Sequence, residues 1–191
     1  MKNLKPALLF FLVFTVICGG IYPALVTGLA QLLFPRQAAG SLVGDYGGRL
    51  SGSSLLGQPF SADRYFWPRP SATAGFAYNP AASGGSNSGP TNPAYLKTVA
   101  ERVEYLRANG VAGSVPAELV QASASGLDPH LSPEAAGLQI PRVARARGMS
   151  EEVLARLVAA RVEERQFGLL GARRVNVLEL NLALDGAVPE Q

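Results

Sequence analysis

A long apolar segment near the N-terminus constrains this chain more than any other feature of its sequence. No charged residue lies between Lys5 and Arg36, and the 27 residues 7–33 are mostly leucine, phenylalanine, valine, isoleucine and alanine. As a helix, a segment of this length rises about 40 Å, which exceeds the roughly 30 Å of hydrocarbon in a bilayer. We therefore expect residues 1–35 to form a cytoplasmic tip and a transmembrane helix. A cleaved signal peptide is the alternative, but the apolar segment is longer than the core of such a peptide.

The predicted helix carries a stripe of small residues. Gly20, Ala24 and Gly28 are spaced four residues apart, and Pro23 interrupts the helical hydrogen bonds. Small residues allow a second helix to approach closely in lipid, where van der Waals packing drives association. We expect these four residues to pack against partner subunits of a membrane complex; a tolerated irregularity is the alternative.

The charges that flank the apolar segment predict its orientation. Lys2, Lys5 and the α-amino group favour a cytoplasmic N-terminus. The protein is then a single-pass protein of the cell (inner) membrane, and residues 36–191 form one domain on the periplasmic, extracytoplasmic side.

This domain is predicted to be α+β, with a small sheet and about three helices. Short strands are expected within residues 40–60, and a period-two leucine pattern over 174–185 predicts another strand, with a helix as the alternative. Cap, proline and acid signals predict the helices, which are expected over 92–110, within 132–148 and after Ser150. Residues 67–93 are rich in Pro, Gly, Ser and Asn and are expected to form a long loop held by Phe76, Tyr78 and Tyr95.

Composition and motifs exclude several classes of function. Only 16% of the residues are charged and they form no like-charge runs, which argues against a nucleic-acid partner. One cysteine and one histidine leave no metal site of the structural zinc type. A Walker A element and an aspartyl-phosphate motif are both absent, so the chain is not expected to be an enzyme.

Two local patterns still suggest chemistry. Asp128 and His130 lie near several serines, so an exported hydrolase or ligand-binding protein anchored by one helix remains the alternative function, although we assign no catalytic residue. The glycine turn over residues 83–87 is compatible with an anion nest or with an ordinary tight turn. Arg142 and Arg145 share a helix face that we expect to be solvated or ion-paired.

Seven segments together resemble the C subunit of the Kdp-type potassium-transporting ATPase. They cover nearly the whole chain in order: 52–60, YFWPRPSA (65–72), SGGSNSGPTNP (83–93), 115–120, GLDPHLSP (126–133), RVARARG (142–148) and RVNVLELNLALD (174–185).

The resemblance implies a non-catalytic accessory subunit of a high-affinity, ATP-driven potassium importer. Its partners would be a channel-like potassium-binding subunit, a P-type ATP-hydrolysing subunit, a small peptide subunit and membrane lipid. The family is described as a catalytic chaperone that raises the pump subunit's affinity for ATP. No tightly bound cofactor is implied, since ATP and K⁺ belong to the complex. The nucleotide-binding residues that the resemblance implies are Ser83, Gly84, Gly85, Ser86, Asn87 and Gln139.

The predicted topology conflicts with direct nucleotide contact. ATP is cytoplasmic, whereas the charge pattern places Ser83 and Gln139 across about 30 Å of hydrocarbon. Either the orientation is inverted, or any effect on ATP affinity passes through the membrane helices. We favour an assembly role, in which the exported domain lies over the entrance of the channel-like subunit.

Overall fold

A computed structural model describes residues 3–44 and 48–186 of the chain. Lys2, part of the basic cluster used above, and residues 45–47 of the predicted strand region lie outside the described residues. The chain divides into two compact units, residues 1–42 and 43–191, and each is described by itself.

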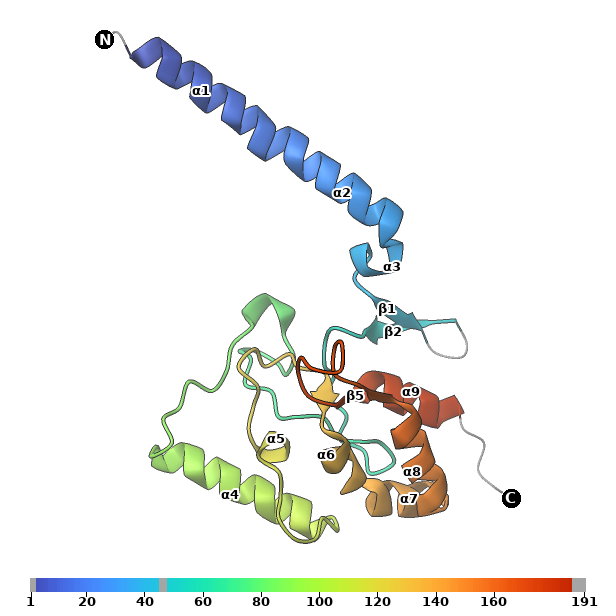
Figure 1. Cartoon of the computed structure of the whole chain (residues 1–191). Helices are drawn as coiled ribbons and strands as arrows, with labels where there is room; N and C mark the ends of the chain where they lie inside the picture. The colour runs from blue at the N-terminus through green and yellow to red at the C-terminus, as the bar shows by residue number, and fades with distance from the viewer. Residues whose placement is uncertain (1–2, 45–47, 187–191) are drawn as a thin grey trace. The chain divides into compact units, whose positions relative to one another are not determined.

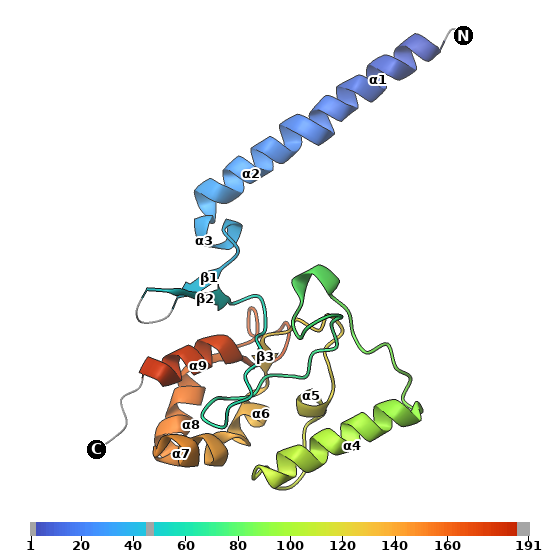
Figure 2. The same cartoon turned by 180° about the vertical axis from the view of Figure 1, so that it is seen from behind.

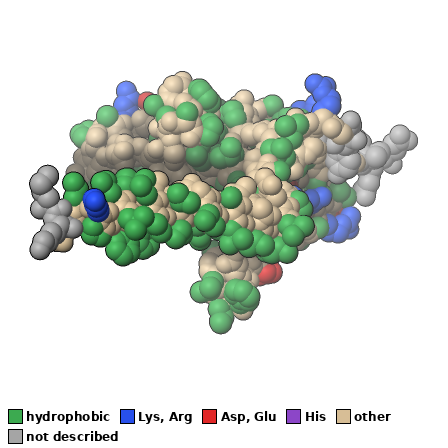
Figure 3. Space-filling model, turned by 90° about the horizontal axis from the view of Figure 1, so that it is seen from above, with side chains coloured by type: hydrophobic (Ala, Val, Ile, Leu, Met, Phe, Trp, Pro, Cys, Tyr) green, Lys and Arg blue, Asp and Glu red, His purple; other side chains and the backbone are tan. Residues whose placement is uncertain are grey.

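The first unit is a long helix followed by a short one. It contains α1 (Leu4–Val16), η1 (Ile17–Ile21), α2 (Tyr22–Leu33) and the short α3 (Pro35–Ala38). The first three form one apolar helix of 30 residues, Leu4–Leu33, which is long enough to cross a membrane. None of its side chains is buried, and apolar side chains lie along the face of the helix that Figure 3 shows. The predicted continuous helix is confirmed.

The irregularity expected at Pro23 is a widened helical turn. Residues Ile17–Ile21 form a π-helix in which the Tyr22 N–H donates to the carbonyl of Ile17. Proline has no N–H, and its ring clashes with the carbonyl four residues earlier, which here belongs to Gly19. An extra residue in the turn relieves this clash without ending the helix.

The second unit contains small sheets and several helices (Figure 1). The chain reaches it through β1 (Leu42–Gly44), which pairs with β2 (Leu50–Ser53). A second, antiparallel sheet has the order β3-β5-β4. The remaining elements are η2 (Pro80–Ala82), α4 (Pro93–Ala108), α5 (Ala117–Val120), β3 (His130–Leu131), α6 (Pro133–Gly137), α7 (Ile140–Arg147), α8 (Glu151–Ala160), β4 (Val162–Glu163), β5 (Arg174–Asn176) and α9 (Val177–Gly186). The α+β class is confirmed.

Local cap signals place the helices as the sequence predicts. The side chains of Asn92, Ser132 and Ser150 accept hydrogen bonds from the first turns of α4, α6 and α8. Gly148 ends α7 with φ +65°, a conformation that glycine adopts without steric cost. Each of these signals acts within a few residues, so the sequence alone was enough to locate them.

The strand predicted over 174–185 is wrong beyond Asn176. The chain instead continues as α9, which was the alternative. Val177, Leu178, Leu180, Ala183 and Leu184 are all buried. A helix that is buried on most sides has apolar residues all round, so its 3.6-residue period is hidden and a period-two pattern can arise by chance.

The long loop is present over residues 67–92, apart from the short η2 turn, and Pro93 already belongs to α4. Tyr78 is the residue that anchors it: its side chain is buried and its hydroxyl donates to the carbonyl of Arg69. Gly57 must be glycine there, because a Cβ at this position would overlap the Tyr78 ring. Phe76 is exposed, so its predicted anchoring role is wrong. Tyr95 is half-buried and lies in α4, so Tyr78 is the one fully buried residue of the three.

Candidate functional site

Two buried carboxamides hold the segment between β2 and the long loop. Asn181 in α9 accepts from the Phe66 N–H (2.9 Å) and donates to the Phe66 carbonyl (3.0 Å). Gln139, at the start of α7, makes the same pair of bonds with Trp67, at 2.7 and 3.0 Å. The backbone N–H and C=O groups of two consecutive residues are thus bonded to side chains, in the way that a sheet bonds them to neighbouring strands. We call Phe66, Trp67, Gln139 and Asn181 the carboxamide clamp.

Arg142 extends the clamp along α7. Its guanidinium donates to the Gln139 carboxamide and to the carbonyls of Asp63 and Tyr65, and lies 3.5 Å from the centre of the Trp67 ring. Burial lowers the pKa of Arg142 to about 10, against the opposing effect of Asp63 and Tyr105, so the group stays charged at neutral pH. A solvated or ion-paired face was expected here. That expectation is wrong for Arg142, which is buried and forms no ion pair with a described residue, whereas Arg145 is exposed.

Arg147 fixes the same segment from the end of α7. It donates to the carbonyl of Arg64 (2.7 Å) and forms an ion pair with Asp185 of α9 (2.6 Å). The Tyr65 hydroxyl also donates to Asp185. Helices α7 and α9 therefore position the aromatic segment between them through charged and neutral hydrogen bonds.

The glycine turn implied to bind nucleotide lies against a different part of the domain. The Ser83 hydroxyl and the Gly84 N–H both donate to the carbonyl of Ser125, at 3.0 and 2.9 Å. Gly85 lies so close to the backbone of Ala124 that a Cβ would come within 3.2 Å of its carbonyl oxygen. Ser86 and Asn87 are exposed.

Gln139 and the glycine turn therefore have different neighbours. Gln139 is fully buried, and both polar atoms of its side chain bond to Trp67. The Gly84 N–H, which an anion nest would use, already has an acceptor. In this conformation Gln139 offers no exposed atom to a phosphate or a base.

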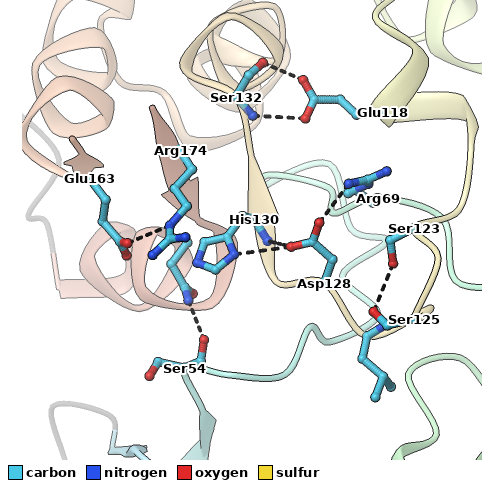
Figure 4. A network of polar contacts seen from close by, with 12 residues as sticks. Ser54, Arg69, Glu118, Ser123, Ser125, Asp128, His130, Ser132, Glu163 and Arg174 are labelled. Atoms are coloured by element: carbon cyan, nitrogen blue, oxygen red, sulfur yellow. Dashed lines mark hydrogen bonds and ion pairs between the residues drawn. The ribbon is translucent and has the colours of Figure 1, made fainter. Parts of the chain in front are cut away.

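A second polar cluster surrounds Asp128 (Figure 4). One carboxylate oxygen accepts from Arg69 at 2.7 Å, and the other lies 3.0 Å from the backbone nitrogen and 3.2 Å from the Nδ1 atom of His130. Partial burial by itself raises the pKa of Asp128, but the hydrogen bonds from His130 and the charge of Arg69 outweigh it and hold the pKa below its usual value. The cluster joins the long loop to β3.

The serines near this cluster do not complete a hydrolase site. The hydroxyls of Ser123 and Ser125 accept from the backbone N–H groups of Gly126 and Leu127, so they cap a tight turn. A triad needs a nucleophile bonded to the second ring nitrogen of the histidine. Among the described residues, neither serine bonds to His130, and the hydrolase alternative is not favoured.

The lowered pKa of Asp128 predicts a pH dependence of stability. A carboxyl whose pKa is lower in the folded state stabilises the fold above its unfolded pKa of about 3.9, and this stabilisation is lost as the pH falls through the folded pKa. Asp128→Asn should therefore reduce the free energy of unfolding at pH 6, and the gap to the unmodified chain should close below about pH 4. Urea unfolding between pH 3 and 6 measures this gap. A gap that is unchanged or wider at pH 3 would contradict the assignment.

A cavity of about 280 Å³ lies beside Trp67. Phe60, Tyr105 and Leu119 give it a mostly apolar lining, and its two arginines are engaged elsewhere, Arg69 by Asp128 and Arg102 by the carbonyl of Val120. The described residues contain no group of three His, Cys, Asp or Glu side chains that could hold a metal ion. The lining of this cavity is suited to an apolar contact.

The comparisons with known proteins decide the family. The family described as "K+-transporting ATPase, c chain" matches residues 4–186. The chain belongs to this family. It is 68% identical to the potassium-transporting ATPase KdpC subunit of Geobacter sulfurreducens over 189 residues, which are 99% of this chain and 100% of the relative. The corresponding subunits of Geobacter metallireducens and Methylococcus capsulatus are 66% and 58% identical, over 99% and 97% of this chain and 100% and 98% of theirs.

The family assignment confirms the resemblance that the seven sequence segments indicated. A K⁺-transporting ATPase c chain is an accessory subunit of the complex rather than its catalytic subunit. The sequence reasoning missed Asn181. A lone amide within the apolar run LELNLALD was a usable signal, because a buried amide must find hydrogen-bond partners.

Proposed function

We propose that this chain stabilises the assembly of an ATP-driven potassium importer by direct contact with its partner subunits. The partners are a channel-like potassium-binding subunit, a P-type ATP-hydrolysing subunit and a small peptide subunit. The chain is held in the cell membrane by α1–α2, with its N-terminus in the cytoplasm and its folded domain outside.

The observation that carries the proposal is the exposed apolar helix. None of the side chains of Leu4–Leu33 is buried, so the helix must be covered by lipid or by other transmembrane helices. A Cβ at Gly20 or Gly28 would meet no atom within 4 Å, so the chain itself does not require glycine there. A close approach by a second helix explains why both positions are glycine.

The proposed effect on ATP affinity is indirect. The hydrogen bonds of Gln139 and Gly84 support structural roles for the residues that the family resemblance assigns to nucleotide. The chain would then raise the pump subunit's affinity for ATP by stabilising a conformation of that subunit through helix contacts.

The orientation can be tested with a cysteine at position 86. In the full transporter, Ser86→Cys is combined with Cys18→Ala, and intact spheroplasts are treated with a membrane-impermeant maleimide. Ser86 is exposed, so we expect labelling from outside. Asn3→Cys in the same background is the matched control and should react only after the membrane is breached.

The reverse pattern would overturn the proposed orientation. If Ser86→Cys reacted only after lysis, the domain would lie in the cytoplasm, and direct contact with ATP would become the better explanation. Reaction of both cysteines in intact spheroplasts would show that the chain is not inserted as proposed.

A further inference from the structure

The hairpin between β4 and β5 presents three apolar side chains to solvent. Phe167, Leu169 and Leu170 are 92%, 80% and 61% exposed. Single exposed apolar residues are common, but a group of them at one loop tip is typical of a membrane or protein contact. We propose that this apolar tip inserts into the headgroup–acyl interface of the bilayer that holds the chain's own helix.

The backbone of the tip is closed on itself. Gln166 and Leu170 exchange two hydrogen bonds, of 3.0 and 2.9 Å, and the N–H groups of Gly168 and Leu169 also have backbone acceptors. Gly168 and Gly171 adopt φ +74° and +83°, which the tight turn requires. Polar backbone groups are costly to place in lipid unless they are bonded within the protein, so a closed turn is suited to insertion.

The hairpin lies at the edge of the domain through which the chain arrives from its helix. The Asn176 side chain, at the end of β5, donates to the carbonyl of Ser54, just after β2 (2.7 Å). Both views show the hairpin beside β2 (Figures 1 and 2). Nine residues, 34–42, separate the end of α2 from the second unit, and nine residues span at most about 30 Å. A linker of this length allows this edge of the domain to reach the membrane surface.

The charges around the tip favour lipid over a protein surface. Four arginines and two glutamates give residues 161–174 a net charge of +2. Arg173 and Arg174 are paired with Glu164 and Glu163, whereas Arg161 and Arg165 form no ion pair with any described residue. Basic side chains beside an apolar tip complement an anionic headgroup layer.

The test compares three labelled versions of the full chain in vesicles. Each version carries an environment-sensitive fluorophore on a single cysteine. The first two are Leu169→Cys and Ala112→Cys, each combined with Cys18→Ala. The third is labelled at the native Cys18. Ala112 is exposed and follows α4, whose C-terminal end lies on the far side of the domain from the hairpin in both views (Figures 1 and 2). The vesicles contain phosphatidylcholine, with or without phosphatidylglycerol, and nitroxide lipids serve as quenchers.

We expect the label at position 169 to show blue-shifted emission and quenching by nitroxide near the headgroup. Both effects should be stronger with phosphatidylglycerol, and the label at position 112 should show neither. The inference rests on the proposed anchoring, which Cys18 reports separately: its label should be quenched by nitroxide deep in the acyl chains.

Three results would overturn the inference. Water-like emission at position 169 together with a deep Cys18 label would refute tip insertion and leave the anchoring intact. A water-like Cys18 label would refute the anchoring and the inference with it. A blue shift at position 169 that appears only in the assembled transporter, without quenching by nitroxide lipid, would identify a partner subunit as the true contact.

Discussion

Gln139→Leu is expected to destabilise the folded domain by about 2–5 kcal/mol, because it leaves buried polar groups without partners. Leucine is similar to glutamine in size, so little cavity forms, but the N–H and carbonyl of Trp67 lose both of their hydrogen bonds. Arg142 also loses one acceptor inside the protein. Trp67 is the single tryptophan of the chain, so its fluorescence reports on the environment of the affected residue. The measurement is urea unfolding of the full chain in mild detergent, followed by this fluorescence.

Gln121→Leu is the matched control for this experiment. Gln121 is exposed, and exposed substitutions of this kind usually change stability by less than about 0.5 kcal/mol. Asn181→Leu should resemble Gln139→Leu, because it removes the equivalent pair of bonds to Phe66. A loss for Gln139→Leu no larger than that for Gln121→Leu would show that the carboxamide clamp does not stabilise the domain.

Features that depend on neighbouring residues were predicted well from the sequence. The length of the apolar helix, the interruption of its hydrogen bonds by Pro23 and the starts of α4, α6 and α8 all follow from patterns of neighbouring residues. Their physics is local: hydrocarbon thickness, a missing N–H group and the unpaired amides of a helix start.

The carboxamide clamp could not be predicted in the same way. Its bonds join residues 72 and 115 positions apart, so no local pattern brings Gln139 or Asn181 to residues 66 and 67. The error in α9 has a related cause, because its burial depends on α8 and β5, which pack against it, and not on its own sequence alone. The expectation that Arg142 would be solvated or ion-paired failed for the same reason, because its stacking on Trp67 is another distant contact.

Gly20→Leu and Gly28→Leu are expected to release the chain from the potassium-transporting complex. A branched side chain at either position would separate two helices that pack through small residues, and lost packing is not replaced by a hydrophobic gain in lipid. The helix itself should tolerate both changes, because a Cβ at each position meets no atom within 4 Å and leucine favours helix more than glycine does. The loss of assembly would then report on partner contacts rather than on folding.

Gly19→Leu provides the matched control. Gly19 is equally open, and it lies on a different side of the helix from the stripe of Gly20, Ala24 and Gly28. This variant should remain in the membrane and assemble normally. If it disrupted assembly as strongly as Gly20→Leu, the small-residue stripe would not be the contact surface.

Co-purification tests the central claim most directly. The complex is captured in mild detergent through a tag on the ATP-hydrolysing subunit, and the amount of this chain that is retained is compared with the amount in the membrane. We predict full retention for the unmodified chain and Gly19→Leu, and strong loss for Gly20→Leu and Gly28→Leu at equal membrane levels. Full retention of both Gly20→Leu and Gly28→Leu would contradict the claim that this face of the helix holds the chain in its complex.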